Sequence, residues 1–228
     1  MCQDRIASGA IFDLDGVIAD TGWAHRQAWA ELAAACGVGF DDELFVRTFG
    51  MQNYQIVPIV LGRSVDGDEL ARLSSWKEQR YRQIVSAYLR PPEGLLALLQ
   101  DLKTNGFRLA IGSSAPPENI ELVLGRLGIA DAFEAVVHGG MVGRGKPAPD
   151  TFLLAAGLLG VPVNRAVVVE DAVAGIEAAK AAGMPVIAIT TTRPAKDLAG
   201  ADMVVDRLSQ LSAKDFMRLI QGRSGMTA

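Results

Sequence analysis

Short apolar runs rich in β-branched residues alternate with helical patterns after about residue 92. We expect strands at Phe107–Gly112, Ala135–Val137, Ala166–Val169, Pro185–Thr190 and Met203–Val205. We expect helices near Gly94–Thr104, Pro117–Leu127, Pro149–Leu159, Val173–Ala182 and Ala213–Gln221. Strands that alternate with helices form parallel sheets covered by helices on both faces. A further strand is expected at Gly9–Leu14, so the pattern predicts an α/β fold with a doubly wound, Rossmann-like parallel sheet.

The segment that follows this first strand has a different pattern, with apolar residues at helical spacing. One helix begins near Trp23 and is stopped by Gly37, where glycine loosens the backbone. Acidic residues at 41–43 and again within 66–69 are typical of helix N-termini, where the helix dipole favours negative charge. Pro91 and Pro92 end the segment because neither can donate a helical hydrogen bond.

One core interrupted by a helical insertion accounts for both patterns. The sequence predicts an α/β core of residues 1–20 and 91–228 and a helical cap domain of residues 21–90. The two connections, Asp20–Gly22 and Arg90–Pro92, are the expected hinges of this cap.

Composition places the chain among ordinary globular proteins, with 50% hydrophobic and 21% charged residues. The net charge is −4 and no basic block occurs, which argues against nucleic acid or an anionic membrane as a partner. No run of about 18 uncharged apolar residues is present, so a transmembrane helix is not expected.

Cysteine usage and the first residues suggest a compartment. Cys2 and Cys36 belong to no ligand-spaced cluster, which argues against a zinc site or a disulfide framework and fits a reducing cytoplasm. The acidic and basic residues of the first five positions do not resemble a signal peptide. We therefore expect a cytoplasmic protein, with a monomer as the default state.

Polar residues gather where the expected strands end, which is where doubly wound sheets bind ligands. These strand-end residues are Asp13 and Asp15, Ser113 and Ser114, Lys146, and Glu170 with Asp171. A single carboxylate there is usually a helix N-cap, but four carboxylates at one edge repel each other unless a cation offsets their charge. Mg²⁺ prefers such oxygen ligands, and a metal beside a lysine and a hydroxyl is suited to gripping a phosphoryl group.

The same residues, taken in order, resemble the four motifs of the haloacid dehalogenase superfamily. The motifs are Asp13-Leu14-Asp15-Gly16-Val17, Ser113, Gly145-Lys146-Pro147 and Glu170-Asp171. The insertion resembles the small helical cap of the branch that contains β-phosphoglucomutases and phosphoglycolate phosphatases. Each motif alone is weak, but four in order at the expected strand ends are a strong signal, and the resemblance spans essentially the whole chain.

The resemblance implies roles for the residues at the edge of the sheet. Asp13 would be the nucleophile that forms an aspartyl-phosphate, and Asp15 would act first as general acid and then as general base. Lys146 would neutralise negative charge on the phosphoryl group and on Asp13. Mg²⁺ would be held by Asp13, the backbone carbonyl of Asp15, Glu170 and Asp171.

The resemblance also implies substrate contacts. The expected substrate-binding residues are Ser113 and Ser114 in the core, and Thr21, His25, Trp29 and Lys77 in the cap. Other cap residues that could face the substrate are Met51, Gln52, Asn53, Arg80 and Tyr81.

Three features bear on the reaction. Dehalogenases of this superfamily lack an acid at the position of Asp15, so its presence points to phosphoryl chemistry. Where β-phosphoglucomutases carry a Lys-Gly-x-x-Arg stretch, residues 49–53 read Phe-Gly-Met-Gln-Asn. Where they carry a Ser-Lys-Asn run, residues 115–117 read Ala-Pro-Pro, which offers no such donors. The sequence therefore favours a Mg²⁺-dependent phosphatase of a small phosphorylated metabolite, such as a sugar phosphate. A phosphomutase that interconverts sugar phosphates remains the alternative.

A non-catalytic receiver-like domain would also place acids at this edge and accept a phosphoryl group on an aspartate. Such domains lack a helical insertion after the first strand, so this sequence favours an enzyme.

Overall fold

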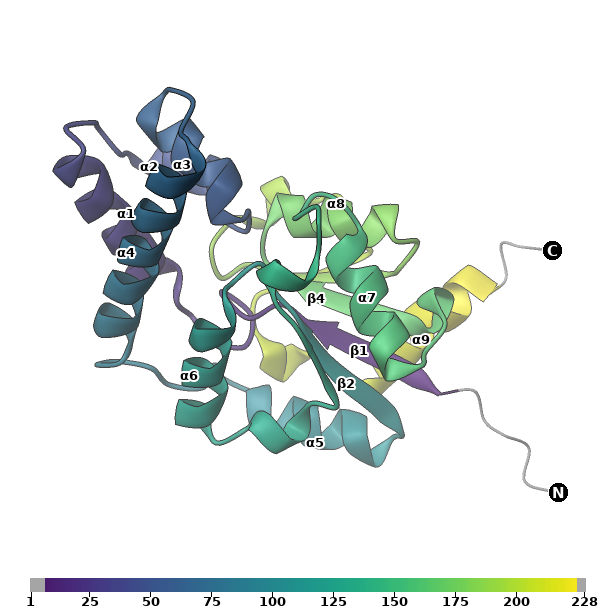
Figure 1. Cartoon of the computed structure of the whole chain (residues 1–228). Coiled ribbons are helices and arrows are strands. Elements are labelled where there is room, and N and C mark those ends of the chain that lie inside the picture. Colours follow the sequence, from purple (N-terminus) through teal and green to yellow (C-terminus); the bar gives the residue numbers. More distant parts are fainter. Residues whose placement is uncertain (1–6, 225–228) are drawn as a thin grey trace, which may run out of the picture.

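The computed structural model describes residues 7–224 of the chain. Cys2 and the segment on which the signal-peptide prediction depends lie outside the described residues, as do residues 225–228. Two parts are visible in Figure 1, a layered α/β core and a group of four helices beside one end of its sheet.

The core is built on one sheet of six parallel strands in the order β3-β2-β1-β4-β5-β6, with β1 between β2 and β4. The strands are β1 (Ser8–Phe12), β2 (Phe107–Gly112), β3 (Ala135–Val137), β4 (Ala166–Glu170), β5 (Val186–Ile189) and β6 (Met203–Val205). This topology confirms the predicted doubly wound, Rossmann-like fold. The first strand ends at Phe12 and not at Leu14, because the Leu14 carbonyl already accepts hydrogen bonds from Ile18 and Ala19 in the following turn.

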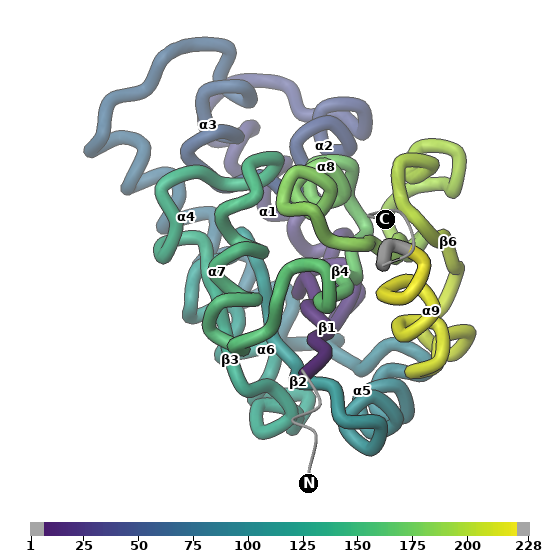
Figure 2. The backbone as a smooth tube through the Cα atoms, turned by 90° about the vertical axis from the view of Figure 1, so that its right-hand side faces the viewer, coloured from purple at the N-terminus to yellow at the C-terminus, as the bar shows by residue number. Residues whose placement is uncertain are grey.

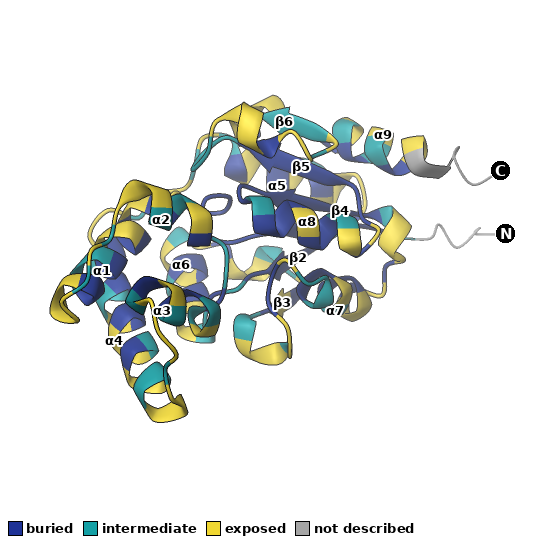
Figure 3. Ribbon diagram, turned by 90° about the horizontal axis from the view of Figure 1, so that it is seen from above, coloured by how far each residue is buried: buried dark blue, intermediate teal, exposed yellow. Residues whose placement is uncertain are grey.

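Helices cover both faces of the sheet (Figure 2), where β1 and β4 lie between α7 and α9. The core helices are α5 (Leu95–Thr104), α6 (Pro117–Leu127), α7 (Asp150–Leu159), α8 (Val173–Ala181) and α9 (Ala213–Ser224). Short 3-10 turns lie at Ala130–Ala132, Gly139–Met141, Val163–Arg165, Ala195–Leu198 and Leu208–Gln210. Along β1, Ala10 and Phe12 pack toward α5 and α9, whereas Ile11 packs toward α7. This alternation buries the strand on both faces. Its neighbour β4 is buried in the same way, as Figure 3 shows.

The cap follows β1 directly and consists of α1 (Gly22–Ala35), α2 (Asp42–Thr48), α3 (Asn53–Leu61) and α4 (Gly67–Val85). Helices α2 and α4 begin at the positions that the acidic residues predicted as helix N-termini. The Asp41 carboxylate accepts a hydrogen bond from Leu44 N over 2.8 Å, and that of Asp66 accepts one from Glu69 N over 2.7 Å.

The cap has its own apolar centre, which includes Trp29, Leu32 and Val57. Helix α3 was not predicted, and its start is capped by glutamine side chains at Gln52 and Gln55. The exact cap limits at residues 21 and 90, and the two hinges, stay predictions. Of the helices in residues 7–224, none combines the length and the apolar character that crossing a membrane requires.

Candidate active site

The end of β1 brings Asp13 to the centre of the sheet edge. Its backbone N–H donates to the carbonyl of Val169 on β4 over 3.0 Å, which fixes the aspartate beside the neighbouring strand. Ser113 follows β2, the neighbour on the other side, and Glu170 is the last residue of β4. The three strand ends therefore place a carboxylate, a hydroxyl and a second carboxylate side by side, as the sequence predicted.

Lys146 connects two of these carboxylates. Its Nζ lies 2.7 Å from Asp13 Oδ1 and 2.6 Å from Glu170 Oε1, and its side chain is fully buried. Burial opposes the ammonium charge, but the two carboxylates outweigh burial and raise the pKa of Lys146. The other Glu170 oxygen accepts hydrogen bonds from the backbone N–H groups of Asp171 and Ala172 over 2.7 and 2.8 Å. Lys146 is therefore a fixed positive charge directly against Asp13.

Asp13, Glu170 and Asp171 form a buried acidic cluster in which one oxygen from each lies within 4.8 Å of the others. Burial, together with the charges of Glu170 and Asp15, raises the pKa of Asp13 to about 7 although Lys146 lowers it. Burial and the charges of Glu170 and Asp13 raise the pKa of Asp171 well above its usual value.

One oxygen of this cluster has no partner. Asp171 Oδ2 accepts a hydrogen bond from Thr192 over 2.6 Å, whereas Oδ1 is buried without a hydrogen-bond partner among the described residues. A buried acceptor left open among repelling carboxylates fits a divalent cation such as Mg²⁺. The side chain of Asp15 is not part of this cluster, so its predicted share in metal binding depends on its backbone carbonyl alone.

Asp15 turns its carboxylate toward the cap. Three cap groups contact the same oxygen, Oδ1: Thr21 donates over 2.6 Å, Tyr81 donates over 3.1 Å, and His25 Nε2 lies 3.1 Å away. Burial alone would raise the pKa of Asp15, but its contacts with His25 and Thr21 and the nearby charge of Lys77 lower it to about 2. No hydrogen bond from residues 7–224 reaches the second oxygen, Oδ2, so it is available for proton transfer.

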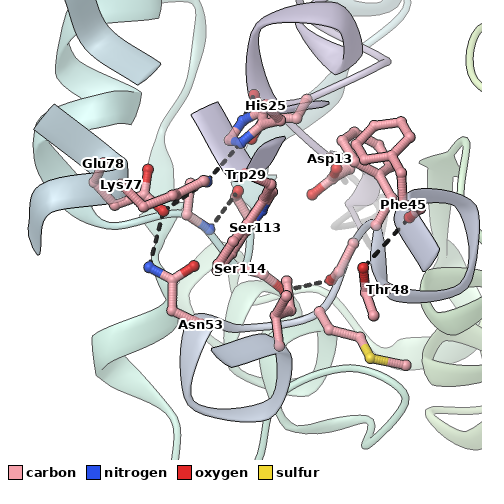
Figure 4. Close-up of a pocket in the computed structure, with 16 residues that line it drawn as sticks. Asp13, His25, Trp29, Phe45, Thr48, Asn53, Lys77, Glu78, Ser113 and Ser114 are labelled. Atoms are coloured by element: carbon pink, nitrogen blue, oxygen red, sulfur yellow. Dashed lines mark hydrogen bonds and ion pairs between the residues drawn. The ribbon is translucent and has the colours of Figure 1, made fainter. Parts of the chain in front are cut away.

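Lys77 lies deeper in the cap and is 2% exposed. Its Nζ donates to His25 Nδ1 over 2.7 Å and to Glu78 Oε1 over 2.9 Å, and it lies 5.0 Å from the centre of the Trp29 ring. Figure 4 shows this chain of contacts, which continues from Glu78 to Asn53. Lys77 is therefore an ion-pair partner within the cap wall.

A small cavity of about 50 Å³ lies between the cap and the edge of the sheet. Seven of the predicted site residues line it: Asp13, Asp15, His25, Trp29, Lys77, Ser113 and Ser114. The other predicted site residues, Thr21, Lys146, Glu170 and Asp171, are buried behind the lining. Of the further cap candidates, Met51 and Asn53 line the cavity, whereas Gln52, Arg80 and Tyr81 do not.

The last three cap residues have other partners. Arg80 pairs with Glu31 on the cap surface, Gln52 donates to the carbonyl of Gly139 in the core, and Tyr81 contacts Asp15. Glu78 also lines the cavity and was not predicted; its position beside Lys77 in the sequence was the available signal.

Polar contacts join the cap to the core around this cavity. Ser114 Oγ donates to the carbonyl of Gly50 over 2.9 Å, and the Gly145 N–H donates to the hydroxyl of Tyr54 over 3.2 Å. Gln52 Nε2 donates to the Gly139 carbonyl over 2.9 Å. The cap therefore lies closed over the edge of the sheet.

A doubly wound core with an acidic cluster and a buried lysine beneath a helical cap defines a class of capped hydrolases. The profile of the haloacid dehalogenase-like hydrolase family matches residues 7–183, and the chain belongs to this family of enzymes.

Its relatives include phosphatases and a phosphomutase. The chain is 35% identical over 211 residues to β-phosphoglucomutase of Bacillus subtilis, and the matched region covers 89% of this chain and 90% of that protein. It is 35% identical over 182 residues to fructose-1-phosphate phosphatase YqaB of Escherichia coli, covering 79% of this chain and 95% of that protein. The crystal structure of β-phosphoglucomutase from Clostridium difficile superposes with a TM-score of 0.87 at 28% identity, covering 96% and 99% of the two chains.

Proposed function

We propose that this hydrolase is a Mg²⁺-dependent phosphatase that removes the phosphoryl group from a small sugar phosphate through an aspartyl-phosphate on Asp13. The observation that carries the proposal is the placement of the Asp13 carboxylate. It contacts the buried ammonium of Lys146, belongs to the acidic cluster and faces the same cavity as Asp15. The two sugar-phosphate enzymes among the relatives support the same chemistry.

In the first step, an Asp13 oxygen attacks phosphorus while the bond from phosphorus to the leaving oxygen breaks. Asp15 is ionised in the free protein, where its pKa is about 2, but the negative charge of a bound phosphate raises this pKa and favours the protonated form. Asp15 Oδ2 then gives this proton to the leaving oxygen, so the sugar leaves as an alcohol. Ser113 lines the cavity and is suited to contact an oxygen of the transferring phosphoryl group, and Lys146 offsets the developing negative charge through its contact with Asp13.

In the second step, Asp15 takes a proton from water, whose oxygen attacks phosphorus and breaks the bond to Asp13. Inorganic phosphate leaves and the Asp13 carboxylate is regenerated. Bound Mg²⁺, held by Asp13, Asp171 and the Asp15 carbonyl with Glu170 nearby, would offset the negative charge of the phosphoryl group and of the acidic cluster. The contacts of Thr21, Tyr81 and His25 with Oδ1 hold the other Asp15 oxygen toward the cavity.

A β-phosphoglucomutase-like phosphomutase is the alternative, and the relationship to such enzymes supports it. A mutase has to retain a bisphosphate intermediate, which calls for cations in the cap. Residues 49–53 supply none, and Pro116 and Pro117 begin helix α6 where donors would be needed. These features favour the phosphatase. A cytoplasmic location and a monomeric state stay predictions from the sequence.

The decisive experiment measures phosphate release from a panel of small phosphate monoesters, including β-glucose 1-phosphate, with and without Mg²⁺. The Asp13→Asn variant should lose at least 1,000-fold in kcat, while Asp131→Asn, an exposed aspartate, serves as the matched control. Conversion of β-glucose 1-phosphate to glucose 6-phosphate without phosphate release would instead establish the mutase.

A further inference from the structure

The leaving group of a substrate bound at Asp13 would lie on the cap side of the cavity. This side contains one buried carboxylate that the phosphatase mechanism does not use. Glu78 is 6% exposed and lines the cavity. Its Oε1 accepts hydrogen bonds from Lys77 Nζ and Asn53 Nδ2, both over 2.9 Å, and its Oε2 accepts one from Asn119 Nδ2 over 2.7 Å. These contacts fix the carboxylate in place.

Glu78 is ionised in this position. Burial alone would raise its pKa, but the charge of Lys77 and its hydrogen bonds lower it. Asn119 is in turn held by Arg82, which donates to Asn119 Oδ1 over 2.9 Å. The carboxylate is therefore a permanent negative charge.

Glu78 cancels the positive charge that the cap offers to the substrate. Among the described residues that line the cavity, Lys77 is the only lysine or arginine, and two of its hydrogen bonds already go to Glu78 and His25. A second phosphate or a carboxylate on the substrate would meet no unpaired lysine or arginine among these lining residues, and it would lie near the Glu78 carboxylate.

The other cap residues that line the cavity suit a polyol. Trp29, Phe49 and Met51 give an apolar surface for C–H groups, and Asn53 and Thr48 are neutral hydrogen-bonding residues. Asn53 uses its amide N–H on Glu78, which leaves its carbonyl oxygen to accept a hydrogen bond from a hydroxyl.

We infer that the Lys77–Glu78 pair restricts the enzyme to phosphate monoesters whose leaving group is uncharged, such as sugar or polyol monophosphates, and excludes bisphosphates and phosphorylated sugar acids. The inference rests on the proposed phosphatase function for the position of the leaving group. It adds a selection against anionic substrates and names the residue that imposes it.

The test compares two ligands that differ only in one terminal group. D-Sorbitol 6-phosphate ends in CH₂OH where 6-phosphogluconate ends in a carboxylate. Binding of each to the Asp13→Asn protein in Mg²⁺ is measured by calorimetry, so that no turnover is required. We expect sorbitol 6-phosphate to bind at least 10-fold more tightly. Equal or tighter binding of 6-phosphogluconate overturns the inference, and this comparison needs no change at Glu78.

The Glu78→Gln substitution then assigns the cause. It leaves the charge of Lys77 unmatched, so the preference should fall by at least 10-fold, mainly through tighter binding of 6-phosphogluconate. The control is Glu134→Gln, which removes a carboxylate from a surface pair with Arg108 and should leave the preference unchanged. A folded Glu78→Gln protein with the same preference as the control contradicts the role of Glu78.

Failure of the proposed function is seen separately. If the protein with Asp13 intact releases no phosphate from any monoester but the binding preference is as expected, the phosphatase proposal is wrong and the charge selection by the cap stands.

Discussion

The hydroxyl of Tyr81 in cap helix α4 donates a hydrogen bond to Oδ1 of Asp15 at the edge of the core sheet, over 3.1 Å. The ring of the same tyrosine stacks on His25, with the ring centres 3.9 Å apart. Tyr81 is fully buried and does not line the cavity. It is therefore a positioning residue, which orients Asp15 only while the cap lies over the core.

Replacing Tyr81 by phenylalanine tests this role. The Tyr81→Phe variant keeps the ring against His25 and removes only the donor to Asp15. A hydrogen bond to a charged group contributes about 1.5–3 kcal/mol. We expect kcat to fall about 10-fold or more with KM nearly unchanged, because the hydroxyl acts on Asp15 and not on the substrate. Tyr88→Phe, at a residue that is 76% exposed, is the control and should change neither constant. An equal rise in KM would indicate that Tyr81 contacts the substrate.

The acidic cluster predicts a pH-dependent stabilisation by Mg²⁺. Without metal, the pKa of Asp13 is raised from 3.8 to about 7, so the folded state binds more protons than the unfolded state between these values. Stability that is fully present below about pH 4 is therefore lost as the pH rises toward 7. Since Mg²⁺ replaces these protons, saturating Mg²⁺ should raise Tm by several °C more at pH 8 than at pH 5. Calorimetry at the two pH values measures this, and equal shifts would argue against Mg²⁺ binding by the cluster.

The Asp171→Asn substitution should change both the stability of the metal-free protein at pH 8 and its response to Mg²⁺. Removing one of the crowded carboxylates relieves repulsion, so the metal-free variant should be more stable than the parent at pH 8, while its Tm should respond little to Mg²⁺. The exposed Asp131→Asn protein should retain the full Mg²⁺ response.

Gly16 leaves room for the Asp171 carboxylate of the acidic cluster because it has no side chain. It adopts φ +82°, and a Cβ there would lie 1.8 Å from Asp171 Oδ2. Gly16→Ala should push Asp171 aside and lower the apparent affinity for Mg²⁺ at least 10-fold. Gly37→Ala is a matched control, because Gly37 also has a positive φ, +72°, with nothing within 4 Å of its Cβ. The control should lose about 1 kcal/mol of stability from backbone strain and keep its Mg²⁺ dependence, measured as activity against Mg²⁺ concentration.

The closed cap leaves too little room for a sugar phosphate. A cavity of about 50 Å³ has space for the centres of roughly three to five water molecules, at about 10–15 Å³ each. A sugar phosphate has more non-hydrogen atoms than this, so the cap has to open to admit substrate. Tyr54→Phe removes an acceptor that holds Gly145 across the boundary between cap and core. We expect KM to rise about two- to twelve-fold, since one neutral hydrogen bond contributes about 0.5–1.5 kcal/mol. X-ray scattering should show a larger radius of gyration in the absence of ligand than with Mg²⁺ and a phosphate analogue. An unchanged radius would contradict cap movement.

Local patterns predicted the fold and the placement of the core residues at one edge of the sheet, whereas the roles of these residues stay predictions. Strand ends in a parallel sheet lie at one edge, so Asp13, Ser113 and Glu170 could be placed together from their positions after apolar runs. The helix N-caps at Asp41 and Asp66 could also be predicted from the sequence, because capping depends on residues three positions apart.

Cap contacts were harder to predict because helical spacing gives a face but not its partner. Thr21 and Lys77 stay predicted substrate contacts. Spacing did not show that the Thr21 hydroxyl donates to Asp15 or that the Lys77 ammonium pairs with Glu78. Both outcomes depend on how α1 packs against α4 and how the cap rests on the core, which residue spacing alone does not determine.

The central position of β1 bears on the order in which the chain can fold. This strand is made first, but its partners begin at Phe107 in β2 and at Ala166 in β4. The four cap helices are contiguous in the chain and can associate as soon as they leave the ribosome, whereas the apolar strand Ser8–Phe12 stays unpaired until the core is synthesised. Nascent chains that stop before Ala166 should therefore bind chaperones or aggregate through β1, even when their cap is already folded.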